Sequence, residues 1–230
     1  SEHAAIAWAA VGVLTYLFGA QATYNVNGEL LTAQQIADQV GFSRKVLGAA
    51  IQPDLDGGKI IGQLVSAKAV QHGQSDGSSS LSWDPVAQPG RPGTDLPYWI
   101  PTPPANAFPP LLPRAGEWKT WHVQNGAMVR PALPASWVGP GVTPGFMAEI
   151  QEVYNVNQAL TQAQLNIAQF WADGGGTVTP PGHWAVELCS HIHNSNFSAP
   201  EAARALAYQA TAAYDSAVCT WDCKYAYWIA

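Results

Sequence analysis

The sequence carries, close to residue 230, a lysine whose surroundings could bind an anion. Lys224 stands among Trp, Tyr and Cys residues, and it is the only lysine after Lys119. Trp221 precedes it by three positions, so the two side chains share a face if the segment is helical. An ammonium group buried among such residues would need a negative partner. Two kinds of partner stay open: a structural carboxylate, from Asp222 or Asp215, or a bound oxyanion.

Two further residues are candidates for support of such a site. Asp215 lies in an apolar stretch of the same expected helix, where we favour a structural hydrogen bond that orients the helix. His183 follows two prolines and a glycine, and we expect it to pack at a helix start rather than to act as an acid or base. Supporting roles for Asp222, Asp215 and His183 remain hypotheses at this point.

Cys189, His191 and His193 lie close enough in sequence to suggest a metal site. Cys189 and His193 would share one face of a helix, but His191 would point away. Three ligands from one short stretch rarely complete a tetrahedral site, so we predict no metal. A disulfide between Cys189 and either Cys219 or Cys223 is geometrically better than one within the last pair, which lie four residues apart. Three ordinary buried thiols are the alternative, and both stay open.

Helices must position these residues. Residues 4–72 are expected to be helical, with a capping box at Thr32 and Gln35, a break at Gly41 and a turn at 53–58. We expect no clear strand.

A second helical part is expected over residues 146–230, ending in the anion-site lysine. It contains a predicted turn at 180–182. Ser198 opens the clearest helix of the sequence, because Pro and Glu follow within its first turn. This helix is expected to continue to about Trp228 and to be buried on most sides.

Between the helical parts, residues 73–145 hold fourteen of the eighteen prolines and five of the ten tryptophans. Proline removes backbone donors, so regular helix and sheet are disfavoured there. A disordered linker would contain few aromatic residues. We therefore predict a long, ordered and irregular wrap that packs on the helices through its tryptophans, in preference to a sugar-binding surface.

Composition excludes some classes of function. The net charge is −6 and the basic residues are scattered singly, so we expect no nucleic-acid partner. The apolar stretch 4–19 is shorter than the ~20 residues of a spanning helix, so we expect no membrane span. Charged residues make up only 11% of the chain. This composition suits a periplasmic or secreted protein, and it allows a homo-oligomer.

Three segments of the last seventy residues carry a family pattern. They are residues 161–173, the Pro-Pro-Gly-His-Trp sequence at 180–184, and residues 202–228 with Trp-Asp-x-Lys-Tyr near their end. These segments resemble the vanadium-dependent haloperoxidases and the related type 2 phosphatidic-acid phosphatases, especially the bacterial haloperoxidase-like branch. Weaker similarity reaches back through Arg130-Pro131 and Trp99.

The resemblance implies an all-α helical bundle of the haloperoxidase and acid-phosphatase type, present here as an incomplete, single-domain fragment over residues 1–230. Lys224 matches the lysine of the family's first anion-binding element, in which Arg-Pro follows after six residues. By this resemblance Lys224 would contact the equatorial oxygens of vanadate, or of phosphate in its place, and Trp221 would line the pocket. The family's Ser-Gly-His and Ser-Arg…His elements do not follow Lys224, so no catalytic set is complete.

We therefore expect the N-terminal portion of an enzyme that oxidises halides with peroxide or hydrolyses phosphate esters. We expect this chain to be inactive without the missing C-terminal half, supplied by the same polypeptide or by a second chain. The alternative is a structural or accessory subunit that keeps the fold and has lost the pocket.

Overall fold

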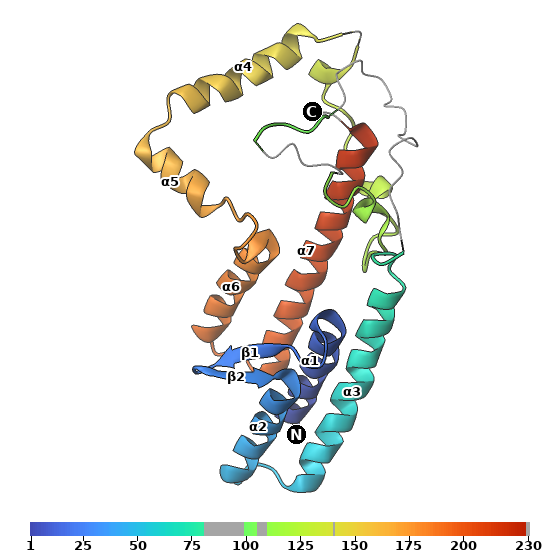
Figure 1. Ribbon diagram of the computed structural model, residues 1–230, viewed down its shortest axis with the longest axis vertical. Coiled ribbons are helices and arrows are strands. Elements are labelled where there is room, and N and C mark those ends of the chain that lie inside the picture. The colour runs from blue at the N-terminus through green and yellow to red at the C-terminus, as the bar shows by residue number, and fades with distance from the viewer. Residues whose placement is uncertain (81–98, 105–109, 140, 229–230) are drawn as a thin grey trace. The chain divides into compact units, whose positions relative to one another are not determined.

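The computed structural model describes residues 1–80, 99–104, 110–139 and 141–228, which fall into two compact units, residues 1–79 and 80–230 (Figure 1). Seven α-helices and one two-stranded sheet occur in the described residues, which confirms the predicted all-α class. No helix among them is both long and apolar enough to cross a bilayer. That residues 1–230 form a single domain stays a prediction.

In the first unit, helices pack closely through small residues. The unit contains α1 (Glu2–Phe18), α2 (Ala33–Val46) and α3 (Gln52–Gln74). The small residues between α1 and α3 are Gly12, Gly58, Gly62 and Ser66. A Cβ added at Gly62 would lie 2.4 Å from the backbone oxygen of Ala5. Since only glycine fits there, the backbones of α1 and α3 touch.

A β-hairpin precedes α2, so the expectation of no clear strand is wrong. Strand β1 (Thr23–Val26) pairs antiparallel with β2 (Glu29–Thr32). Asn27 and Gly28 form the turn, with φ of 52° and 91°. Asn-Gly is the strongest short-range signal for such a two-residue turn, because both residues tolerate positive φ.

Three predictions in this unit have different outcomes. The capping box is confirmed, because Gln35 N–H donates to Thr32 Oγ1 and Thr32 N–H donates to Gln35 Oε1. The break at Gly41 is wrong, because α2 continues through this buried glycine. The turn at 53–58 is also wrong. Pro53 stands in the first turn of α3, where the amide that proline lacks has no helical acceptor.

The second unit contains four helices: α4 (Pro144–Gln158), α5 (Gln162–Phe170), α6 (Thr179–His193) and α7 (Ala199–Tyr227). The start of α7 is confirmed, since the N–H and Oγ of Ser198 both donate to Glu201, at 2.8 and 2.7 Å. The turn predicted at 180–182 is wrong, because both prolines occupy the first turn of α6.

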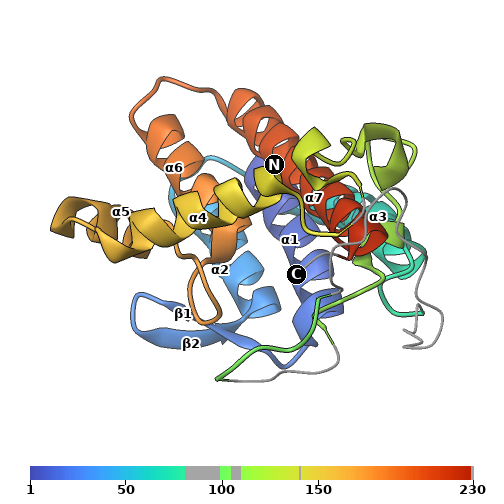
Figure 2. The same ribbon diagram turned by 90° about the horizontal axis from the view of Figure 1, so that it is seen from above.

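The described part of the predicted wrap is irregular and packs on α7. Its regular structure is three short 3-10 helices: η1 (Ala115–Glu117), η2 (Gly126–Val129) and η3 (Ala135–Trp137). Both η1 and η2 contact α7, and in Figures 1 and 2 they lie beside its C-terminal half. Trp99 packs edge-on against Trp228, with ring centroids 5.9 Å apart. Trp83 lies outside the described residues.

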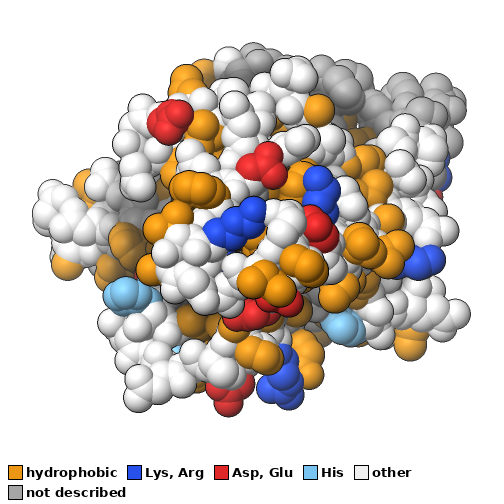
Figure 3. Space-filling view, turned by 90° about the horizontal axis from the view of Figure 1, so that it is seen from below, with side chains coloured by type: hydrophobic (Ala, Val, Ile, Leu, Met, Phe, Trp, Pro, Cys, Tyr) orange, Lys and Arg blue, Asp and Glu red, His pale blue; other side chains and the backbone are white. Residues whose placement is uncertain are grey.

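The second unit leaves much apolar surface open. Neither α4 nor α5 has a buried residue. Even the apolar side chains of Val153 in α4 and Ile167 in α5 are 69% and 60% exposed. Only Asp215 and Val218 are buried within α7, so the expectation that α7 is buried on most sides is wrong. Exposed apolar side chains are not confined to these helices, since the face of the molecule seen from below also shows hydrophobic groups between charged ones (Figure 3). The described elements thus cover α7 mainly along the side that faces the wrap.

Candidate oxyanion site at the end of helix α7

Two glycines bring the wrap against the backbone of α7. A Cβ at Gly116 would lie 2.4 Å from the backbone N and Cα of Asp222. A Cβ at Gly126 would lie 2.4 Å from the Cβ of the same aspartate. Because any larger residue would collide with α7, these positions fix how closely η1 and η2 approach the helix turn that carries Asp222 and Trp221.

Asp215, seven residues before Asp222 on α7, binds the same wrap through hydrogen bonds. Its buried carboxylate accepts hydrogen bonds from the backbone N–H groups of Trp121 and His122, at 2.8 and 2.7 Å. The imidazole of His122 also lies 2.8 Å from Thr211 Oγ1. The expected structural hydrogen bond is therefore confirmed. A buried carboxylate needs such donors, and here backbone amides supply them.

Asp222 forms a two-pronged ion pair with Arg130 of the wrap. Arg130 Nε and Nη2 donate to the two carboxylate oxygens, at 2.8 and 2.9 Å. The hydrogen bonds to Asp222 raise the pKa of Arg130 above its ordinary value. The planar guanidinium fork matches a carboxylate in a way that lysine cannot. Asp222 is thereby occupied on the wrap side of α7.

Aromatic side chains bind the last two turns of α7 to backbone carbonyls. Trp221 Nε1 and the Tyr225 hydroxyl both donate to the carbonyl oxygen of Leu111, at 3.1 and 2.6 Å. The Tyr227 hydroxyl donates to Pro131 O at 2.6 Å. Burial raises the pKa of Tyr225. Since its indole N–H is already used, Trp221 can offer an anion site only its ring.

Lys224 is exposed, so the expectation that its ammonium is buried is wrong. Its Nζ lies 5.1 Å from the ring centroid of Trp221. At 100° per residue, Lys224 points about 200° around the helix from Asp222, away from the ion pair with Arg130. The carboxylates of Asp222 and Asp215 are both bound elsewhere, and no described carboxylate pairs with Lys224. Without burial, however, the ammonium does not require a partner.

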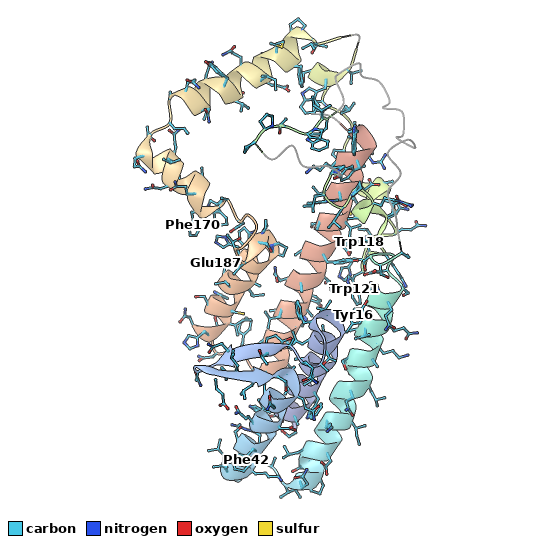
Figure 4. All side chains as sticks on the ribbon, viewed as in Figure 1. Tyr16, Phe42, Trp118, Trp121, Phe170 and Glu187 are labelled. Atoms are coloured by element: carbon cyan, nitrogen blue, oxygen red, sulfur yellow. The ribbon has the colours of Figure 1, made fainter. Side chains whose placement is uncertain are left out.

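His183 has a packing role at the corner between α5 and α6, as expected. Its Nδ1 lies 3.0 Å from both carboxylate oxygens of Asp173, and its ring stacks on Trp171 at 4.5 Å. Phe170, labelled in Figure 4, packs edge-on against the same imidazole. Among the described residues, no contact joins this cluster to the turns of α7 that carry Lys224.

All three cysteines are free, so the disulfide alternative is not realised in this structure. The alternative of three buried thiols is wrong for Cys189, which is exposed, while Cys219 and Cys223 are partly buried on α7. Burial raises the pKa of both partly buried thiols. Within the described part of the chain, no cluster of three His, Cys, Asp or Glu side chains could hold a metal ion.

A vanadate or phosphate site at the end of α7 would find one free cationic donor, Lys224, among the side chains described above. Such an anion spreads its charge over several oxygens, and a binding site needs several preformed donors around them. Lys224 provides one ammonium and Trp221 one ring face, and the nearby carboxylates are turned away or paired. These residues alone do not surround an oxyanion, so no catalytic step is derived from them.

Sequence reasoning missed two partners. Arg130 lies 92 positions from Asp222, and its only signal was the weak family similarity at Arg130-Pro131. Asp173 lies ten positions before His183 and follows the end of α5 with a φ of 40°. A polar residue before three glycines is a turn signal, but it does not identify a histidine partner.

Comparison with known proteins identifies the fold. No family model matches the sequence, and no curated protein matches it significantly. A solved structure described as the first bacterial vanadium-dependent iodoperoxidase is similar, with a TM-score of 0.57 and 19% sequence identity. The likeness covers 98% of this chain and 62% of that one. The chain therefore has a haloperoxidase-like fold, and it spans less than two thirds of that neighbour's length.

Proposed function

We propose that this chain is the N-terminal portion of a vanadate- or phosphate-binding enzyme, with halide oxidation by peroxide as the leading activity. Lys224 would contact an oxygen of the anion, and Trp221 would form a wall beside it. The observation that supports the proposal most is the haloperoxidase-like fold itself, with Lys224 and Trp221 side by side at the end of α7. Phosphate-ester hydrolysis is the second activity of the same kind of site.

The remaining donors would come from a C-terminal half, in the same polypeptide or in a second chain. Open apolar surface on α4 and α5 supports this part of the proposal, because large exposed aliphatic and aromatic patches mark interfaces. The same surface could pair two copies of the chain, so a homo-oligomer belongs to the proposal. A periplasmic or secreted location, inferred from the low charge content, also remains a proposal.

An accessory, non-catalytic subunit is the alternative. It is favoured by the way in which Asp215, Asp222 and His183 are all engaged in structural contacts. In that case the wrap and α7 would serve only to keep the fold, and Lys224 would be an ordinary solvated lysine.

The test uses the full-length protein, including whatever follows residue 230. Iodide oxidation by peroxide is measured with and without added orthovanadate, and p-nitrophenyl phosphate hydrolysis is measured without it. The proposal predicts iodide oxidation that requires vanadate, or phosphatase activity that vanadate inhibits. A full-length protein that binds no vanadate and shows neither activity would favour the accessory role.

A further inference from the structure

The ion pair between Arg130 and Asp222 lies on the side of α7 opposite Lys224. The pair is held at 2.8 and 2.9 Å, and its side chains are 31% and 16% exposed. Gly116 and Gly126 press against the same aspartate. These contacts hold the Asp222 carboxylate against the wrap. Its negative charge is therefore fixed on the side of α7 opposite the Lys224 side chain.

The charges around this end of α7 give Arg130 a defined role. From η1, Arg114 and Glu117 pair with each other and cancel. Asp222 and Arg130 also cancel, which leaves Lys224 with a net positive charge in the last two turns. Asp215, about two turns earlier, is hydrogen-bonded to two backbone amides. If Arg130 were neutral, the charges of Asp222 and Lys224 would sum to zero.

We propose that Arg130 controls the charge of the oxyanion site by neutralising Asp222 through the helix, without touching the anion itself. This inference rests on the proposed function of Lys224. A helix is about 10–12 Å across, so an uncompensated carboxylate on its far side still repels a bound anion. Electrostatic interactions at this range are weakened by solvent but not abolished. Arg130 and Asp222 are thus positioning residues for an anion that Lys224 contacts.

The test compares orthovanadate affinity, measured by isothermal titration calorimetry, among charge variants of the full-length protein. Arg130→Gln leaves the carboxylate unpaired, and at low ionic strength we expect its dissociation constant to rise about fivefold. Arg130→Gln combined with Asp222→Asn restores the net charge without an ion pair, and its dissociation constant should return to within about twofold of the wild type. Arg130→Lys keeps the charge but loses the fork, so it should lie near the wild type as well.

Glu187→Gln, which removes an exposed carboxylate from α6 (Figure 4), is the control and should leave the affinity unchanged. Circular dichroism checks that each variant is folded. If Arg130→Gln does not fold, Asp222→Asn alone decides. It leaves Arg130 as an uncompensated positive charge, so it should bind vanadate more tightly than the wild type, and equal affinity would overturn the inference.

Wild-type affinity in Arg130→Gln would overturn the inference. So would a double variant as weak as Arg130→Gln, since geometry and not charge would then matter. A wild-type protein that binds no vanadate would reject the proposed function of Lys224 itself, and with it this inference. The three failures are distinguishable, because only the last one removes binding before any substitution is made.

Discussion

Asp215 and Asp222 lie seven residues apart on one face of α7, and each binds the wrap in its own way. Asp215 accepts two backbone N–H groups, whereas Asp222 pairs with a guanidinium. The first arrangement needs no charged partner and is compatible with deep burial. The ion pair of Asp222 with Arg130 stays partly exposed to solvent. Because both carboxylates are bound by groups of the wrap, neither forms an ion pair with Lys224.

Replacing Asp215 by Asn tests the first arrangement. The amide keeps one acceptor oxygen but turns an NH2 donor toward a backbone N–H, so one buried donor is left without a partner. We expect the free energy of unfolding to fall by about 2–3 kcal/mol, measured by urea denaturation followed by circular dichroism. Glu187→Gln, an exposed change in the same unit, should shift it by less than about 0.5 kcal/mol. Equal stability of the two variants would contradict the assigned role of Asp215.

The three thiols should differ in reactivity. The thiolate is the nucleophile, and burial raises the pKa of Cys219 and Cys223, so less thiolate is present at a given pH. We expect iodoacetamide at pH 8 to label the exposed Cys189 about tenfold faster than the other two. Peptide mass spectrometry with time measures each rate. Equal rates at all three positions would show that α7 is more open than the structure indicates.

At this scale, the sequence predicted which side chains share a face of α7 better than it predicted what surrounds them. Trp221 and Lys224 share a side of α7, as their spacing requires, because helix periodicity is local. The expected burial of Lys224 was wrong because burial depends on which elements cover each side of α7. The pairing of Asp222 with Arg130 joins residues far apart in sequence, and no local pattern encodes it.

At the scale of elements, the helix contact between α1 and α3 depends on small residues. A methyl group at Gly62 would meet the backbone of α1 at 2.4 Å, whereas one at Gly57 would meet nothing within 4 Å. Both glycines lie within α3. They form a matched pair in which helix propensity is the same and only the packing differs.

Gly62→Ala should therefore lower the free energy of unfolding by about 1–3 kcal/mol, because the helices must move apart. Gly57→Ala should raise it by about 0.5–1 kcal/mol, because alanine is the better helix former. Urea denaturation of both variants beside the wild type gives the comparison. A stabilising Gly62→Ala would mean that α1 and α3 do not pack as described.

The start of α7 should respond to pH through Glu201. Hydrogen bonds from Ser198 hold the pKa of this carboxyl below its ordinary value of 4.5. Its contribution to stability is thus present above about pH 4.5 and is lost as the pH falls through the lower, folded-state pKa. Glu201→Gln should lower the thermal midpoint at pH 7, and the difference from wild type should shrink by pH 3. Glu152→Gln, exposed on α4, should show no such change with pH.

Capping signals predicted elements well because they act over three residues, as at Thr32 and Ser198. The wrong predictions of turns and breaks concern proline and glycine, which occur both at the ends of helices and within them. Proline breaks a helix interior but also starts helices, which explains the errors at Pro53 and Pro180. Glycine can break a helix but can also lie within one. Gly41 is a buried residue of α2, and Leu55 of α3 lies next to it.

At the scale of the whole molecule, the fold class was predictable and the extent of the core was not. Helical periodicity and family motifs indicated an all-α, haloperoxidase-like chain, and the likeness to the iodoperoxidase structure agrees with that fold. The open side of α7 and the unburied helices α4 and α5 could not be foreseen, since apolar composition does not reveal what covers a surface. Under the proposed function, this open surface would receive the remaining part of the site.

The central claim is that Lys224 binds an oxyanion, and titration of the full-length protein with orthovanadate tests it most directly. A charge-assisted hydrogen bond contributes about 1.5–3 kcal/mol, so Lys224→Ala should raise the dissociation constant for vanadate about 10- to 100-fold. Lys119→Ala, at an exposed lysine of the wrap, should leave it unchanged. Equal vanadate affinity in wild type and Lys224→Ala would contradict the account.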